Sequence, residues 1–170
     1  MDEHVDIVDE QNKVVGSSSK KEAHEKGFLH KTVIAEVMGT DGNWTLVKQA
    51  SDRQDAGQYV SPVGGHVQSG ETDEDALRRE AYEECGLSGI FLFRYVGKKI
   101  FNREVRGRKE NHYFILYEII TDEKPILNNE SVDFKRFSRE ELKKGFAENP
   151  KQFGDAFHFI VQTFYPELLI

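Results

Sequence analysis

The segment from Gly64 to Leu87, GGHVQSGETDEDALRREAYEECGL, constrains the fold more than any other part of this chain. Thr72 and Asp75 form a variant of the helix capping box, and Gly86 supplies a left-handed stop. The spacing therefore predicts a helix that begins near Asp73. Carboxylates crowded on one helix repel one another, so this segment requires partners that offset their charge.

Helix geometry gathers three of the carboxylates on one side of this predicted helix. At about 100° per residue, Glu80, Glu83 and Glu84 fall within an arc of roughly 100°. Clustered carboxylates are the ligands that hard divalent cations such as Mg²⁺ or Mn²⁺ prefer. The helix geometry alone also fits a solvated acidic face, which is the usual meaning of a charge run.

The residues around the three glutamates favour the metal site. Gly64 and Gly65 let the backbone approach closely, so a carbonyl there can complete a metal shell. Arg79 follows Glu71 at a spacing that lets the preceding loop fold back and pair the two side chains. A stripe on the neighbouring edge of the helix is expected to face the core: Leu77, Ala81 and Cys85.

The rest of the chain predicts one α/β domain spanning residues 1–170. With 170 residues, 38% of them hydrophobic and 31% charged, the chain has the size and composition of a single globular domain. Residues 1–28 are expected to form a small hairpin around the turn Glu10 to Asn12 and a short helix packed on it. That helix has Ser19 as its cap and Gly27 as its stop.

Strands and helices alternate after residue 28. We expect strands at Thr32–Met38, Trp44–Gln49, Ile90–Phe101, His112–Ile120 and Val132–Phe137, with a polar loop between the third and fourth. A helix is expected from Ser138 to near Asn149. A last amphipathic helix carries a core stripe: Phe153, Phe157, Ile160 and Phe164. The whole is predicted to be an α/β/α sandwich of mixed β-sheets flanked by helices.

The acidic segment also matches a known signature. Gly65, Glu71 and the run from Arg79 to Leu87 resemble the Nudix box, GX₅EX₇REUXEEXGU, with every fixed position matched. The resemblance implies the Nudix α/β/α sandwich and hydrolysis of a nucleoside diphosphate linked to another group. It also implies that Glu80, Glu83 and Glu84, with the carbonyl of Gly65, bind Mg²⁺, for which Mn²⁺ can substitute.

The resemblance also implies a role in catalysis for the metal and for several of these residues. The metal activates a water for attack on phosphorus, and the Glu71–Arg79 pair supports the loop that holds the glutamates. One of the three glutamates, or a glutamate on a later loop, acts as general base. Glu110 is the candidate on a later loop, and its alternative reading is an exposed loop glutamate.

Three other stretches narrow the resemblance to one branch of the family. DEHVDIVDEQNKVVGSS, EAHEKGFLHKTV and VGGHVQSGE look like the isopentenyl-diphosphate isomerase-like Nudix proteins. In that branch, histidines bind a metal, and the implied ligands of a second metal here are His24, His30, His66 and Glu110. The alternative is structural, with His24 capping or packing the short helix and His30 pairing across strands.

The same resemblance separates three possible functions. The isomerase needs a cysteine just before its Gly-His pair, where this chain has Gly64, and Cys85 is expected in the core. A hydrolase is therefore favoured over an isomerase. A non-catalytic module that senses a nucleotide is the third possibility, and the intact glutamates argue against it.

Charge and hydropathy limit the partners. A net charge of −7 argues against nucleic-acid or anionic-membrane binding, while divalent cations still allow a small anionic substrate. No segment reads as a signal peptide or membrane span, so a cytoplasmic protein is expected. A homodimer is possible by analogy with such folds. A local basic cluster either grips substrate phosphates or forms a solvated hairpin tip: Arg103, Arg106 and Arg108.

Overall fold

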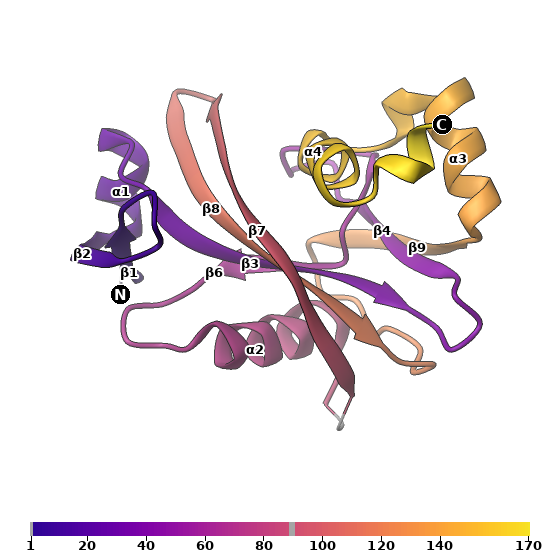
Figure 1. The fold of residues 1–170 in the computed structure, drawn as a ribbon, viewed down its shortest axis with the longest axis horizontal. Helices are drawn as coiled ribbons and strands as arrows, with labels where there is room; N and C mark the ends of the chain where they lie inside the picture. The colour runs from indigo at the N-terminus through magenta and orange to yellow at the C-terminus, as the bar shows by residue number, and fades with distance from the viewer. Residues whose placement is uncertain (1, 89–90) are drawn as a thin grey trace.

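One mixed β-sheet forms the centre of the molecule. The computed structural model describes residues 2–88 and 91–170, and within them nine strands join in this sheet (Figure 1). The central strand β3 (His30–Met38) runs parallel to β8 (Arg108–Ile120) and antiparallel to β6 (Val63–His66). The sheet continues through β1 (His4–Val8), β2 (Val14–Ser19), β4 (Trp44–Gln49), β5 (Tyr59–Val60), β7 (Leu92–Val105) and β9 (Ser131–Phe137).

Helices cover both faces of the sheet, and this confirms the predicted α/β/α sandwich. Side chains of β3 alternate between the faces. Val33 and Ala35 pack with Leu77 of α2 (Asp73–Cys85), whereas Ile34 packs with Phe157 of α4 (Asp155–Phe164). The α4 side also carries α3 (Arg139–Glu148) and the 3₁₀ turns η1 (Pro150–Gln152) and η2 (Pro166–Leu169). In the part of the chain that the structure describes, no helix combines the length and apolar character needed to span a bilayer.

The local signals at the helix ends are confirmed. The hydroxyl of Ser19 accepts a hydrogen bond from the Glu22 N–H (3.1 Å) and begins α1 (Lys20–Lys26), which ends at left-handed Gly27. Thr72 caps α2 through the Asp75 N–H (3.1 Å). The helix presents Leu77, Ala81 and Cys85 to the core as expected, and all three side chains are buried.

The hairpin of β7 and β8 corrects the predicted loop between Phe101 and His112. The strands continue in register to a tight turn at Arg106 and Gly107, which have φ angles of 50° and 78°. Polar composition suggested a loop, but cross-strand pairs such as Arg103 and Glu110 (3.1 Å) keep these polar residues in strands. The predicted start of the strand at Ile90 lies outside the described residues. The short strands β5 and β6 were not expected.

A buried carboxylate pair lies on the α4 side of the sheet. Glu36 of β3 is next to Glu118 of β8 in the parallel register, and both side chains are buried. Glu118 accepts hydrogen bonds from Arg94 Nε (2.6 Å) and the Tyr165 hydroxyl (2.7 Å). Glu36 accepts one from the Ser61 hydroxyl, and burial raises the pKa of Glu36 to about 8. Glu36 therefore carries a proton in the folded protein at neutral pH.

Replacing Glu36 with glutamine should stabilise the protein increasingly as pH rises. The folded-state pKa of about 8 exceeds the ordinary value of 4.5, so ionisation of Glu36 removes stability as pH rises from 4.5 to 8. Glu36→Gln keeps a hydrogen-bonding side chain without this cost. Urea unfolding should show a gain over wild type that grows between pH 5 and pH 9, reaching a few kcal/mol at about 1.4 per pKa unit.

A matched control is Glu104→Gln, because Glu104 is an exposed glutamate on β7. Its effect on the free energy of unfolding should stay small and independent of pH in this range. A pH-independent difference between Glu36→Gln and wild type would show that Glu36 is ionised in the folded protein.

Candidate active site

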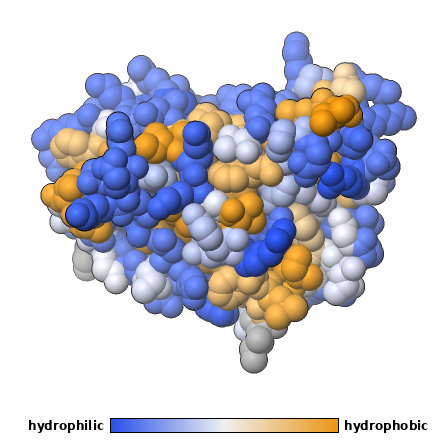
Figure 2. Space-filling view, viewed as in Figure 1, coloured by the Kyte–Doolittle hydropathy of each residue, from blue (hydrophilic) through white to orange (hydrophobic). Residues whose placement is uncertain are grey.

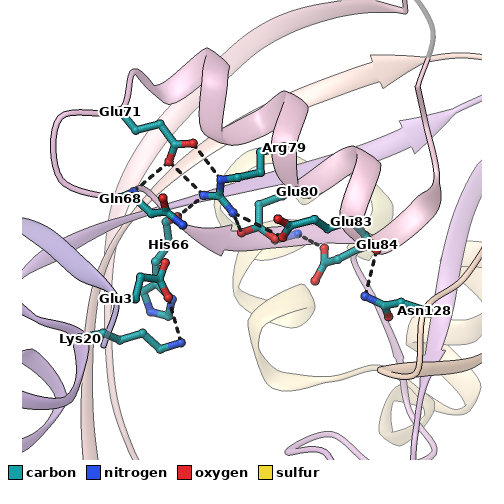
Figure 3. A network of polar contacts seen from close by, with 11 residues as sticks. Glu3, Lys20, His66, Gln68, Glu71, Arg79, Glu80, Glu83, Glu84 and Asn128 are labelled. Carbon is teal, nitrogen blue, oxygen red and sulfur yellow. Dashed lines mark hydrogen bonds and ion pairs between the residues drawn. The ribbon is translucent and has the colours of Figure 1, made fainter. Parts of the chain in front are cut away.

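The loop before α2 and the C-terminal half of α2 bring the predicted carboxylates to one edge of the sheet. The Glu84 carboxylate accepts a hydrogen bond from the Gly64 N–H (2.7 Å), which ties α2 to β6. Gly65 lies against Glu80, and a Cβ at this position would overlap the Glu80 carboxylate. The need for glycine at position 65 is therefore steric. Figure 3 shows the side chains of Glu80, Glu83 and Glu84 gathered beside this strand.

Arg79 supplies the positive charge that the carboxylate cluster requires. Its guanidinium donates from Nε and Nη2 to the two oxygens of Glu71 (2.8 and 3.0 Å), and from Nη1 to Glu80 (2.6 Å). A further hydrogen bond reaches the carbonyl of His66 (3.0 Å), and Glu83 lies 3.5 Å away. The predicted pairing of Glu71 and Arg79 is present in the structure. Arg79 also bonds to Glu80 of α2 and to the His66 carbonyl of β6.

In the metal-free protein, burial has the largest effect on the pKa values of Glu80 and Glu84. Burial raises the pKa of Glu80 to about 7, although Arg79 opposes the shift. It raises the pKa of Glu84 to about 9, with further contributions from Glu80 and Glu130. At Glu71 burial also disfavours ionisation, but the hydrogen bond from Arg79 outweighs it and holds the pKa below its ordinary value. A bound dication would favour the ionised forms of Glu80 and Glu84.

Glu130 joins the same site, although no pattern in the sequence indicated it. It lies just before β9 and lines a hollow of about 360 Å³ together with Glu80, Glu83 and Glu84. Its loop is fixed to α2 because Asn128 donates a hydrogen bond to the Glu83 carbonyl (3.0 Å). Glu130 is far from the Nudix box in the sequence, so only the fold brings it there.

Lys20 is the second residue that sequence reasoning missed. The first residue of α1 lines the same hollow and pairs with Glu3 (3.3 Å). Figure 3 shows Lys20 and Glu3 close to His66, to the lower left of the glutamates. An ammonium group is thereby placed in the hollow that the glutamates and Arg79 also line.

Four histidines from four elements converge next to the glutamates. His24 of α1, His30 of β3, His66 of β6 and His112 of β8 each offer one ring nitrogen within 4.8 Å of the others. Three of them were expected together. His112 was not expected, because its place depends on the parallel register that puts it beside His30.

The ring nitrogens of this histidine cluster suit a metal ion. The backbone carbonyl of Phe28 lies 2.8 Å from His30 Nδ1, so this nitrogen carries the proton and Nε2 offers a lone pair. His30 Nε2 and His66 Nε2 are buried, and neither has a hydrogen-bond partner in the described structure. Burial lowers the pKa of His24 to about 4 and lowers the pKa of the other three as well. The imidazoles are therefore neutral, as metal ligands must be.

Glu110, the glutamate expected on a later loop as a candidate general base, lies within β8 instead. It is two residues before His112, at the histidine end of the site. It is a buried residue within β8, and its two oxygens accept hydrogen bonds from Arg103 (3.1 Å) and Arg108 (3.0 Å). Arg103 and Arg108 are thus partly neutralised by Glu110. Arg106 occupies the exposed turn, so the structure does not group it with the other two.

The two centres share strand β6. Gly65 contacts Glu80, and the next residue, His66, contributes its ring to the histidine cluster and its carbonyl to Arg79. A rigid strand therefore fixes the carboxylates and the imidazoles relative to each other.

Comparison with known proteins identifies the family. The model of the NUDIX domain matches residues 28–157, so this chain belongs to the Nudix family and the resemblance seen in the sequence is confirmed. An isopentenyl-diphosphate Delta-isomerase from Photorhabdus laumondii is 32% identical over 141 residues, covering 79% of this chain and 77% of that protein.

Other similar proteins are named as hydrolases or have solved structures. An uncharacterized Nudix hydrolase from Streptomyces coelicolor is 36% identical over 105 residues, 56% of this chain, and the match spans about half (55%) of that relative. The crystal structure of DR0079 from Deinococcus radiodurans has a TM-score of 0.76 at 25% identity, covering 96% of this chain and 99% of that one. These comparisons therefore agree on the Nudix family and on the fold.

Arg79→Ala should destabilise the loop before α2. The substitution leaves Glu71 and Glu80 without their partner in a partly buried setting, which costs about 1–3 kcal/mol of unfolding free energy. Urea unfolding measures this loss, and hydrogen exchange should report faster exchange at the Glu71 and Gln68 amides.

Arg139→Ala provides the control, since Arg139 is an exposed arginine whose ion pair with Glu167 is 3.5 Å long. It should change the free energy of unfolding by less than about 1 kcal/mol. Equal losses for the two variants would mean that Arg79 acts as an ordinary surface cation.

Proposed function

We propose that this chain is a Mg²⁺-dependent hydrolase that cleaves a diphosphate linkage in a small nucleoside diphosphate derivative. The observation that carries the proposal is the convergence of Glu80, Glu83 and Glu84 beside the Gly65 backbone, with Arg79 holding the loop. Three carboxylates and a carbonyl are oxygen ligands, which suit Mg²⁺, and Mn²⁺ can substitute. The proposed metal ligands are Glu80, Glu83, Glu84 and the Gly65 carbonyl.

The bound metal, Lys20 and the Glu71–Arg79 pair have separate roles in the proposed reaction. Mg²⁺ bound here supplies charge neutralisation of the diphosphate and a water of lowered pKa. Lys20 offers its ammonium group to phosphate oxygens that the metal leaves uncovered. Arg79 and Glu71 keep the glutamates in place without contacting substrate.

A carboxylate must accept the proton of the attacking water. Glu130 takes the place of Glu110 as the candidate on a later loop, because Glu130 lines the hollow of the glutamates and Glu110 is paired with two arginines. Glu84 is the other candidate. In the protein alone its pKa of about 9 leaves it protonated, so a bound metal must first favour its ionised form.

An isomerase activity is the alternative that the relatives raise. The Photorhabdus relative is named as an isomerase, but position 64 here is glycine and contributes no thiol. Cys85 cannot replace it, because its Sγ is buried and donates to the Pro62 carbonyl (3.3 Å). Burial also raises the pKa of Cys85 to about 12, so no thiolate forms at neutral pH. A purely nucleotide-sensing module would have no need for the complete carboxylate set.

The histidine cluster supports a second metal in the same proposal. His24, His30, His66 and His112 present nitrogen ligands, which favour Zn²⁺ and similar transition metals over Mg²⁺. We leave Glu110 out of this ligand set, because its two oxygens already accept hydrogen bonds from Arg103 and Arg108. Arg103 remains a candidate for substrate phosphate, since its Nη1 is buried without a hydrogen-bond partner in the described structure.

Glu84→Gln tests the hydrolase. Neutralising one metal ligand should lower turnover of a cleaved nucleoside diphosphate derivative by roughly 10²–10³, with folding retained. Wild-type activity should vanish with EDTA and return with Mg²⁺. Glu104→Gln is the control and should turn over as wild type does, because Glu104 is exposed on β7. Full turnover in chelated buffer would contradict the metal assignment. Interconversion of isopentenyl and dimethylallyl diphosphate would favour the isomerase.

His66→Gln tests the second metal without an activity assay. We expect the protein purified in the presence of Zn²⁺ to carry one equivalent that Mg²⁺ does not displace, and the variant to lose most of it by elemental analysis. His158→Gln is the control, because His158 lies on α4 and bonds to the Pro150 carbonyl (2.7 Å). Equal Zn²⁺ content in wild type and His66→Gln would contradict a histidine-bound metal.

A further inference from the structure

The C-terminal end of α2 is completed by the segment that precedes β9. A helix leaves its last four carbonyls without partners inside the helix. In α2 the Cys85 carbonyl accepts a hydrogen bond from the Ile126 N–H (2.8 Å). The Glu83 carbonyl accepts one from the side-chain amide of Asn128 (3.0 Å). The helix that carries the proposed metal ligands is therefore joined to residues 126–130 at two points.

Hydrogen bonds, rather than burial, hold residues 126–130 in place. All five residues are exposed or half-buried, and Ile126 is 72% exposed. Figure 1 places this segment, between β8 and β9, in the lower part of the molecule, and Figure 2 shows apolar residues on the surface of that part. The position of the segment therefore depends on its polar contacts.

The amide group of Asn128 uses both of its polar atoms. Nδ2 donates to the Glu83 carbonyl, and Oδ1 accepts a hydrogen bond from the Glu130 N–H (3.0 Å). The two partners fix the orientation of the amide, because a carbonyl can only accept and an N–H can only donate. One side chain therefore sets the distance between the main chain of Glu83 and the main chain of Glu130.

The connection between β4 and β5 holds Glu130 from the other side. The Glu130 carbonyl accepts a hydrogen bond from the N–H of Ala50, the residue directly after β4 (2.9 Å). Arg53 Nη1 lies 3.5 Å from the Glu130 carboxylate in a half-exposed ion pair, which by itself contributes little. Ala50 and Arg53 thus join Glu130 to this connection, whereas Asn128 joins it to α2.

The position of Glu130 matters because a general base must reach the attacking water. Glu130 lines the same hollow as Glu83 and Glu84, and its charge contributes to the raised pKa of Glu84, so these carboxyl groups lie close together. The proposed metal ligands are side chains of α2. A misplacement of about 1 Å can lower turnover by about 10²-fold. A base that is held by the same helix keeps its distance from those ligands.

We propose that Asn128 is a positioning residue that holds Glu130, the general base, at a fixed distance from the glutamates of α2. Glu130 accepts the proton of the attacking water while the water oxygen bonds to phosphorus, and the bridging oxygen leaves with the electrons of the broken P–O bond. Glu84 is left as a metal ligand, because its carboxylate already accepts a hydrogen bond from the Gly64 N–H. The inference rests on the proposed hydrolase, and Asn128 acts through the main chain of its two partners.

Steady-state kinetics test the role of Asn128. The substrate is the one that wild type cleaves fastest with Mg²⁺ among nucleoside diphosphate sugars, dinucleotides and coenzymes. Glu130→Gln should lower kcat by about 10²-fold or more. Asn128→Ala should lower kcat by about tenfold or more and leave KM within about twofold, because it displaces the base without removing a substrate contact. Asn129→Ala is the control, since Asn129 is the exposed neighbour in the same segment, and it should retain wild-type kcat.

Two further measurements separate positioning of the base from support of the helix. Once Glu130→Gln has removed the base, adding Asn128→Ala should lower kcat little further, whereas general support of α2 would lower kcat equally in both backgrounds. The Mn²⁺ dissociation constant of Asn128→Ala, measured by calorimetry, should stay within about twofold of wild type, because the proposed ligands on α2 are intact.

Asn128→Ser keeps the proposal testable if Asn128→Ala fails to fold. Its hydroxyl can accept a hydrogen bond from the Glu130 N–H but is too short to reach the Glu83 carbonyl, so kcat should again fall, with folding confirmed by circular dichroism. An unchanged kcat in the Asn128 variants, an equal loss in Asn129→Ala, additive losses in the double variant or a large loss of Mn²⁺ affinity would overturn the role of Asn128. A wild type without Mg²⁺-dependent turnover would overturn the hydrolase itself, and this proposal with it.

Discussion

The Arg79 guanidinium is the interaction on which the site depends. Glu71, Glu80 and Glu83 all lie within reach of this one cation, so their mutual repulsion is offset inside the loop–helix unit. The same group bonds to the carbonyl of His66 and so joins α2 to β6. A planar guanidinium can do this because it offers five donors in fixed directions, whereas an ammonium group is a single point charge.

The parallel pairing of β3 and β8 is the second constraint. It places His30 beside His112 at one end of the strands and Glu36 beside Glu118 further along. At the histidine end, the neutral imidazoles present nitrogen ligands. At the other end, Glu36 keeps its proton because burial disfavours its ionised form, and the pair remains in the core. One register thus produces a cluster suited to a metal ion and a buried carboxylate pair that needs none.

Features that depend on interactions between residues close in the sequence were predictable, and features that depend on distant residues were not. Capping residues, the glycine stop and the Glu71–Arg79 pair act over a few residues, so the ends of α2 and its support were predictable. Lys20 and Glu130 reach the site through pairing between distant strands, and no local pattern indicates them. The hairpin beyond Phe101 was mistaken for a loop because cross-strand ion pairs hold polar residues in strands.

Core packing and one hydrogen bond to β6 together fix the position of α2. Leu77 and Ala81 anchor it to the sheet, which leaves one flank for the glutamates and the other for Tyr82. Because Glu84 and the Gly64 amide are joined by a single 2.7 Å hydrogen bond, a small rotation would separate the carboxylates from β6. The packing of Leu77 and Ala81 therefore positions the metal site as well as holding the helix on the sheet.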